Sequence, residues 1–189
     1  TVPQAGTDFE VIEGVELTQP GRSLLVEEYF SYGCIHCKNF DPELEAWLTT
    51  LPEDVEFARK PTAFSRTWSI LAQAYYALEK AEALEGNHEQ LFKGIHNGGR
   101  MFNSGQDIAD YLDSQALPAS EFMRAFNSRD VARRLNRATE DTRRAGIRAV
   151  PTLVVAGKYR VGMTHGAQRA LEVVEHLLEQ ERALLMKQS

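Results

Sequence analysis

Apolar residues near the N-terminus of this chain follow strand patterns. Residues 9–12 form a short strand-like run, and residues 24–30 form a stronger one after a Pro-Gly turn signal. Because the stronger run is almost continuously apolar, it predicts a central strand that is covered on both faces. A helical pattern follows it, and residues 55–59 then alternate like a further strand.

The middle of the chain changes to helical spacing. Trp68 and Leu71 begin an apolar helical face, and Ser104 and Ser128 stand where helices are capped. No strand pattern of comparable quality lies between residues 65 and 145. Strand patterns return at residues 151–155 and 159–161, before a last amphipathic helix. This order predicts an α/β domain that is interrupted by an all-helical insertion.

Composition narrows the class of protein. The length of 189 residues suits one domain with a large elaboration, and 43% hydrophobic with 25% charged residues argues against disorder. No uncharged apolar run approaches the roughly 18–20 residues that span a bilayer. A net charge of −6 and a pI near 5.4 argue against a nucleic-acid partner.

Two local features qualify this picture. Residues 129–148 hold seven arginines and three acids, a pattern that fits either a solvated helix face with paired charges or a docking surface. The first residues read like the end of a mature chain after removal of a secretory signal, which favours an exported protein.

Both cysteines of the chain lie in one motif, Cys34-Ile35-His36-Cys37, where the central strand passes into a helix. At a helix N-terminus, unpaired backbone N–H groups and the helix dipole favour a negative sulfur on Cys34. His36 adds positive charge or a donor, and both effects lower the pKa of the thiol. Cys37, one turn inside the helix, is expected to be more buried and less reactive.

Two other interpretations of the cysteine pair compete with redox chemistry. A structural zinc site normally has four ligands, but the chain has no second cysteine pair and its other histidines are scattered. An inert structural disulfide would close a loop of only four residues and would remove little entropy from the unfolded chain. Redox chemistry is therefore the favoured interpretation.

The run from Phe30 to Cys37, together with Ala149-Val150-Pro151-Thr152 before a late strand, resembles the thioredoxin superfamily and specifically its DsbA-type thiol oxidases. The resemblance covers essentially the whole chain. It implies an α/β thioredoxin-like fold with a mixed central sheet, formed by residues 1–64 and 146–189, and a helical insertion at 65–145. The family usually has proline at the position of Ile35, so the redox poise is open.

The resemblance also implies a substrate-binding site. Val150-Pro151 is expected to form a cis peptide packed against the disulfide, with the backbone of Val150 pairing with an extended substrate beside Ile35. An ordinary trans proline that opens an edge strand is the alternative interpretation.

Two acids, Glu27 and Glu28, interrupt the central strand, and at least one of them should face a covered side. Glu28 matches a buried acid that helps proton transfer from the buried cysteine in the DsbA-type family, and Arg59 matches its basic neighbour. A strand-end salt bridge is the alternative role for Glu28. Asp41 is a weaker candidate for the same network.

The expected activity is that of a thiol–disulfide oxidoreductase working mainly as an oxidase, with Cys34, Cys37, His36 and Glu28 as catalytic residues. The redox-active disulfide carries the electrons, so no cofactor or metal is expected. The resemblance implies unfolded cysteine-containing proteins as substrates, a membrane quinone-linked oxidase of the DsbB type as partner, and a periplasmic monomer.

Other functions remain open alternatives. A reductase or isomerase of the same fold is one of them, although isomerases generally need a dimerisation module and the residues before the central strand leave no room for it. A dithiol metal-binding protein and a holdase belong to other classes.

Overall fold

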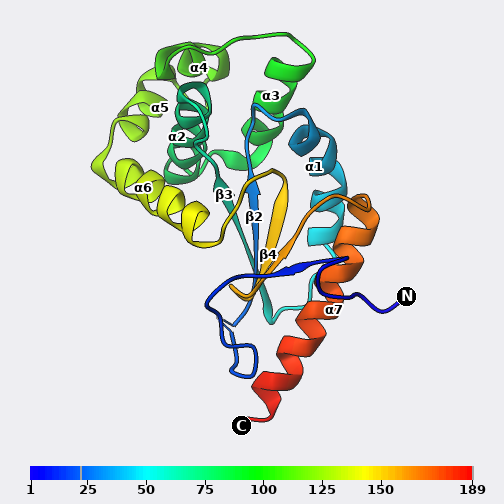
Figure 1. Ribbon diagram of the computed structural model, residues 1–189. Helices are drawn as coiled ribbons and strands as arrows, with labels where there is room; N and C mark the ends of the chain where they lie inside the picture. The colour runs from blue at the N-terminus through cyan, green and yellow to red at the C-terminus, as the bar shows by residue number, and fades with distance from the viewer. Residues whose placement is uncertain (22, 189) are drawn as a thin grey trace. The chain divides into compact units, whose positions relative to one another are not determined.

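The computed structural model describes residues 1–21 and 23–188. Within them, the chain forms five strands and seven helices (Figure 1). In chain order these are β1 (Glu10–Val11), β2 (Leu24–Phe30), α1 (Ile35–Leu48), β3 (Val55–Pro61), α2 (Arg66–Lys80), α3 (Leu84–His96), α4 (Gly105–Leu112), α5 (Ala119–Phe126), α6 (Arg129–Arg144), β4 (Thr152–Val155), β5 (Tyr159–Val161) and α7 (Ala167–Met186).

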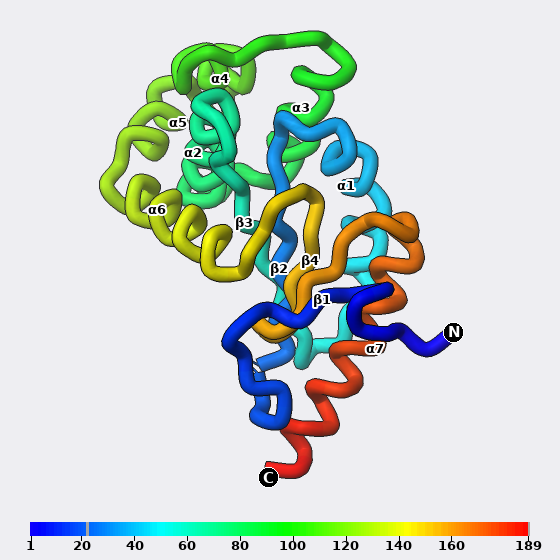
Figure 2. The backbone as a smooth tube through the Cα atoms, viewed as in Figure 1, coloured from blue at the N-terminus to red at the C-terminus, as the bar shows by residue number. Residues whose placement is uncertain are grey.

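The chain divides into two compact units. The sheet unit holds residues 1–30, 39–60 and 142–189, and the helical unit holds 31–38 and 61–141. Figure 2 shows the chain leaving β3 for α2 and coming back from α6 to β4. The helical unit includes residues 31–38, which the sequence pattern assigns to the thioredoxin-like part, because Tyr32 packs against the helices that follow.

The five described strands form one sheet in the order β1-β5-β4-β2-β3. β4 pairs antiparallel with β2 on one side and with β5 on the other, and β5 pairs antiparallel with β1. Glu28 of β2 lies opposite Leu153 of β4 in this register. β2 is therefore an interior strand, as its nearly continuous apolar sequence predicts.

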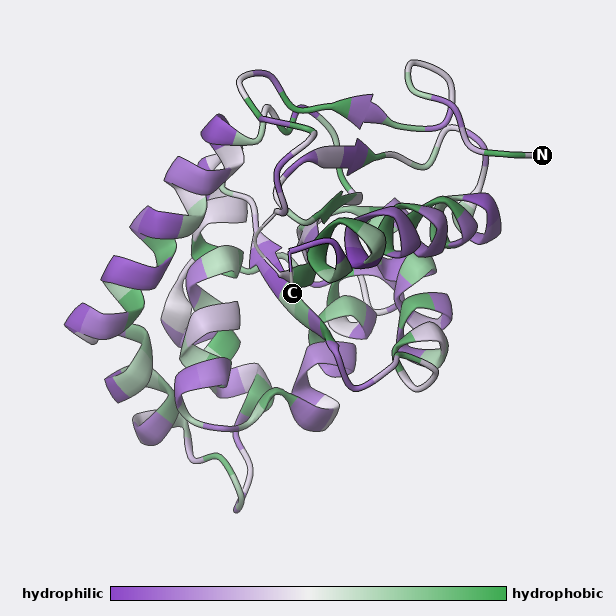
Figure 3. Ribbon diagram, turned by 90° about the horizontal axis from the view of Figure 1, so that it is seen from below, coloured by the Kyte–Doolittle hydropathy of each residue, from purple (hydrophilic) through white to green (hydrophobic). Residues whose placement is uncertain are grey.

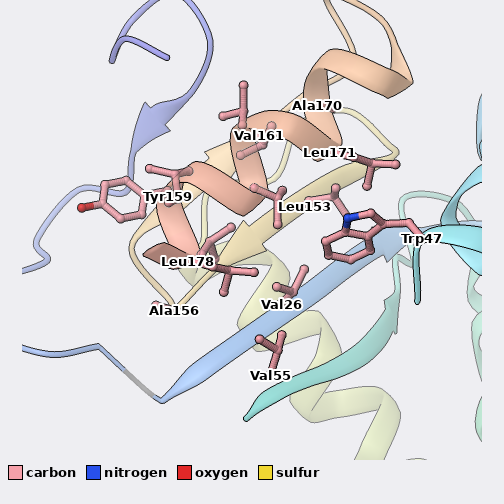
Figure 4. Close-up of a cluster of buried hydrophobic side chains, with 14 of the residues drawn as sticks. Val26, Trp47, Val55, Leu153, Ala156, Tyr159, Val161, Ala170, Leu171 and Leu178 are labelled. Atoms are coloured by element: carbon pink, nitrogen blue, oxygen red, sulfur yellow. The ribbon is translucent and has the colours of Figure 1, made fainter. Parts of the chain in front are cut away.

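Successive residues of the central strands face opposite sides of the sheet. Val26 and Leu153 lie in a large apolar cluster with residues of α1 and α7, among them Trp47 and Leu178 (Figure 4). Tyr29 and Val154 face the other way and pack with Ile12, Ala145 and Ile147. Both faces of the sheet are thus buried, and the α1–α7 side holds the larger core.

Serine caps begin three of the helices in the helical unit. The side chains of Ser65, Ser104 and Ser128 accept hydrogen bonds from backbone N–H groups in the first turns of α2, α4 and α6. This confirms the caps predicted at Ser104 and Ser128. The helices have hydrophobic and hydrophilic faces, visible as green and purple in Figure 3. In α6, Arg134 pairs with Asp130 at i, i+4 spacing, as a solvated face predicts.

No helix in the described part of the chain is long and apolar enough to cross a membrane.

A buried ion pair ties the loop before β2 to α7. The ammonium of Lys158 lies 2.9 Å from Glu181, and it also donates to the backbone carbonyl of Gln19. The second carboxylate oxygen of Glu181 accepts the backbone N–H of Gly21 at 3.2 Å. Both charged side chains are almost fully buried, so the attraction between them offsets the cost of removing each charge from water.

We expect Lys158→Met to lower the free energy of unfolding by about 3–5 kcal/mol, because the change leaves the buried Glu181 side chain without its ion-pair partner. Adding Glu181→Leu to that variant should recover part of the loss. Urea unfolding measures the effect, and Lys187→Met at an exposed position of the same residue type is the control. Equal losses in the two lysine variants would contradict this role.

Candidate active site

Cys34 sits directly before the first residue of α1. Its backbone N–H donates to the carbonyl of Ser31 at 3.1 Å, and its own carbonyl accepts the N–H of Lys38 at 3.1 Å. The carbonyl therefore makes the first helical hydrogen bond, which is the geometry of an N-terminal cap. The two cysteines are in the reduced form in the structure and are not joined by a disulfide.

Hydrogen bonds from the Cys37 side chain and from the helix N-terminus make Cys34 acidic. Its pKa falls from an ordinary value of 9.0 to about 5, and the largest cause is the hydrogen bond from the Cys37 side chain. Backbone N–H groups of Cys37 and His36 lower the pKa further, while burial opposes them. The charge of His36 adds a smaller lowering, so the Cys37 thiol contributes more to this acidity than His36 does.

The two cysteines differ in access to solvent. Cys37 is fully buried, whereas Cys34 is partly exposed and is flanked by exposed Ile35 and His36. At neutral pH the Cys34 sulfur is a thiolate, which is the nucleophilic form and the better leaving group. An attacking sulfur thus has access to Cys34 and not to Cys37.

Two aromatic residues, Trp68 and Phe64, lie close to the segment that leads into the redox motif. The indole of Trp68 lies against Gly33, where an added Cβ would come within 2.5 Å of Nε1. The ring of Phe64, itself 49% exposed, lies 5.9 Å from the Trp68 ring. Trp68 is partly buried. The apolar spacing in the sequence identifies one face of α2, but it does not show how deeply each residue on that face is buried.

A carboxylate cluster surrounds Arg59 in the sheet unit. The guanidinium contacts Glu28 at 3.1 Å, Asp41 at 3.2 Å and Glu45 at 2.6 Å. Burial raises the pKa of Glu28 to about 8, since the opposing charge of Arg59 is shared with the two other carboxylates. Glu28 is therefore mostly protonated at neutral pH.

Asp41 brings helix α1 into this cluster. Asp41 lies four residues after Cys37, so the two side chains occupy the same face of the helix one turn apart. The neighbouring Glu27 is also buried and pairs with Lys60 at 3.1 Å. Both acids of the central strand thus face covered sides, on opposite faces of the sheet.

The Val150–Pro151 peptide bond is cis, which confirms the cis geometry expected from the resemblance. Pro151 is buried at the start of β4, and the Val150 side chain packs on the cluster that contains Ile12 and Tyr29.

Comparison with known proteins decides the family. Residues 25–178 match the model of the DSBA-like thioredoxin domain. The chain belongs to the DsbA family. It is 35% identical over 171 residues to the thiol:disulfide interchange protein DsbA of Azotobacter vinelandii, covering 89% of this chain and 79% of that protein. Its identity to the Pseudomonas aeruginosa protein of the same name is 32%, over 97% of this chain and 88% of that one.

Solved structures agree with this assignment. The crystal structure of Pseudomonas aeruginosa DsbA superposes with a TM-score of 0.90 at 30% identity, covering 97% of each chain. DsbA from Xylella fastidiosa gives 0.89 at 28% identity, covering 97% of this chain and all of the other. These results confirm the α/β thioredoxin-like fold class, and the DsbA-family chain is a thiol–disulfide oxidoreductase.

We expect the reduced protein to develop thiolate absorbance at 240 nm with a midpoint near pH 5, and Cys34→Ala to abolish this transition. Cys37→Ala should move the midpoint upward because the sulfur loses its side-chain donor, and by more than His36→Leu does. An unmoved midpoint in Cys37→Ala would show that the donor is not the main cause of the acidity.

We expect Glu28 to lower stability as the pH rises. Its folded pKa of about 8 lies above the unfolded value, so the folded state binds more protons between pH 5 and 8 and its free energy of unfolding falls across that interval. Glu28→Gln lacks this titration, so its free energy of unfolding should rise by about 3–4 kcal/mol relative to that of the parent protein from pH 5 to pH 8. Urea unfolding of both reduced proteins measures the difference.

The control for this change is Glu43→Gln, an exposed position of the same helix that Asp41 and Glu45 share. If the two variants show the same pH dependence as the parent protein, Glu28 does not carry the raised pKa.

Proposed function

We propose that this DsbA-family protein works mainly as an oxidase that donates the Cys34–Cys37 disulfide to folding secreted polypeptides. The observation that carries the proposal is the contrast between the two sulfurs: Cys34 is accessible and has a pKa near 5, whereas Cys37 is fully buried. A stabilised thiolate is a good leaving group, and an interaction that stabilises the reduced form makes the pair more oxidising.

The reaction takes two steps. A substrate thiolate attacks the Cys34 sulfur of the oxidised protein, so the Cys34–Cys37 bond breaks, a mixed disulfide forms and Cys37 leaves as a thiolate. A second substrate thiolate then attacks the substrate sulfur of the mixed disulfide and releases Cys34 as a thiolate. The substrate has lost two electrons, which the two sulfurs of the reduced protein now hold. Of the two protons that the substrate thiols gave up, one goes to Cys37 and the other stays in solvent, because Cys34 remains largely ionised.

Glu28 is the proposed proton donor and acceptor for Cys37. A group with a pKa of about 8 exchanges protons with a thiol at neutral pH without a large energetic barrier, which an ordinary carboxylate would not do. Asp41 and Arg59 connect this acid to the helix face one turn after Cys37. Arg59 donates a hydrogen bond to Glu28 at 3.1 Å and so holds the acid in place in either protonation state.

The proposed substrate site uses exposed apolar groups near the motif. Ile35 is 44% exposed, and Phe64 and Trp68 form an aromatic pair in the same unit. These three side chains are the proposed apolar contacts for an unfolded substrate. The family resemblance adds the backbone of Val150, next to Pro151, as the pairing edge for an extended segment.

The remaining features follow from the family. The disulfide itself carries the electrons, so no bound organic cofactor is required. A membrane quinone-linked oxidase of the DsbB type would restore the disulfide. The proposed location is the periplasm, where substrates with reduced cysteines emerge and disulfides persist. The proposed working form is a monomer.

The equilibrium of the Cys34–Cys37 pair with glutathione tests the oxidase function. We expect a potential well above the about −270 mV of thioredoxin, together with oxidation of a reduced two-cysteine peptide. Cys34→Ser should abolish that oxidation, because it removes the sulfur that the substrate attacks.

Other outcomes separate the alternatives. A potential as reducing as that of thioredoxin would overturn the oxidase proposal in favour of a reductase. Suppression of aggregation that survives replacement of both cysteines by serine, with no peptide oxidation by the parent protein, would identify a holdase. Stoichiometric zinc or copper binding by the dithiol without redox turnover would identify a metal-binding protein.

A further inference from the structure

The residue two positions before Cys34 is a buried tyrosine. Tyr32 is 1% exposed, and its ring lies 4.9 Å from the ring of Phe92 and 5.0 Å from that of His88, both in α3. The Tyr75 ring of α2 lies 6.5 Å away. The segment that leads into the redox motif is therefore anchored in the helical unit.

Two histidines of α3 bind this tyrosine. The Tyr32 hydroxyl lies 2.6 Å from Nδ1 of His88, and Nε2 of His96 lies 2.7 Å from the Tyr32 backbone carbonyl. A carbonyl oxygen only accepts hydrogen bonds, so Nε2 of His96 carries the proton and donates it. The side chain of Tyr32 and its backbone are thus each held by a separate histidine.

The held segment sets the position of the Cys34 sulfur. The Ser31 hydroxyl accepts the Gly33 N–H at 3.0 Å, the Ser31 carbonyl accepts the Cys34 N–H at 3.1 Å, and Trp68 covers Gly33. Tyr32 lies inside this turn, so a shift of its backbone moves Cys34 relative to the N–H groups of His36 and Cys37. Hydrogen bonds weaken steeply with distance and angle, and those to the sulfur would weaken with such a shift.

We propose that His96, assisted by His88, is a positioning residue of the redox centre: through Tyr32 it holds the turn that aims the Cys34 sulfur at the N-terminus of α1. Neither histidine needs to touch the reacting sulfur. The inference rests on the proposed function, in which the Cys34 thiolate is the leaving group.

The decisive comparison is between His96→Leu, which removes the donor, and His96→Gln, whose side-chain amide can donate to the same carbonyl. Cys34 acidity is measured by the 240-nm titration, and redox poise by the equilibrium with glutathione. We expect His96→Leu to raise the Cys34 midpoint by about 0.5 to 1 pH unit, which corresponds to a loss of about three- to tenfold in thiolate preference. His96→Gln should keep the Cys34 midpoint close to that of the parent protein, because its side-chain amide can donate the same hydrogen bond.

The chain offers a matched control. His165 is exposed and also places Nε2 against a backbone carbonyl, that of Thr7 at 3.1 Å, in the sheet unit. His165→Leu removes the same kind of hydrogen bond and should leave both the titration and the glutathione equilibrium unchanged.

A second set of variants keeps the inference testable if His96→Leu does not fold. Tyr32→Phe and His88→Phe each remove one side of the hydroxyl–imidazole hydrogen bond and preserve a ring at the site. Each should raise the Cys34 midpoint, and the double variant should shift it by less than the two single shifts combined, because both remove the same interaction.

The outcomes distinguish the inference from the proposed function. If the parent protein shows no acidic thiolate, the proposed function fails. If the parent protein does show it but the His96 and His88 variants keep its midpoint and glutathione equilibrium, the positioning role is overturned. Equal shifts in His96→Leu and His96→Gln would also overturn it, since the hydrogen bond would then not be the cause.

Discussion

The start of helix α1 is the constraint on which the redox centre depends. The first turn of any helix leaves backbone N–H groups without partners inside the helix, and here the N–H groups of His36 and Cys37 find theirs in the Cys34 sulfur. The Cys37 thiol donates the hydrogen bond that lowers the pKa of Cys34 most, and these backbone donors lower it further. A thiolate accepts such hydrogen bonds better than a thiol does, so the Cys34 thiol is acidic. The same turn carries Cys37 into the interior, which leaves one sulfur of the pair accessible and the other covered.

Two clusters of charged side chains in the sheet unit are compensated in different ways. Lys158 and Glu181 balance one another and hold the loop before β2. Arg59, in contrast, serves three carboxylates, and the most deeply buried of them, Glu28, keeps its proton at neutral pH. A neutral acid costs less to bury than an unpaired carboxylate, and it has a proton available at the pH where a thiol exchanges one.

The helical unit does more than lengthen the chain. Its α3 helix supplies the side chains that bury and hold Tyr32, and its α2 helix supplies Trp68 against Gly33. The turn before Cys34 therefore belongs structurally to the insertion rather than to the strand that precedes it. Gly33 fits this arrangement because its missing side chain leaves room for the indole.

The sequence by itself determined the elements and the chemistry of the motif, because both depend on residues close together in the chain. Alternating and helical apolar spacing located β2, α2 and α7, serine caps marked α4 and α6, and the two cysteines one turn apart identified a redox pair. The tertiary structure decided everything that joins distant residues. It added Glu45 to the expected group of Glu28, Asp41 and Arg59, it left Trp68 partly exposed, and it brought His88 and His96 to Tyr32. A local sequence pattern does not predict such contacts. The pKa of a buried acid and the role of a histidine depend on which groups the fold brings within a few ångströms of them.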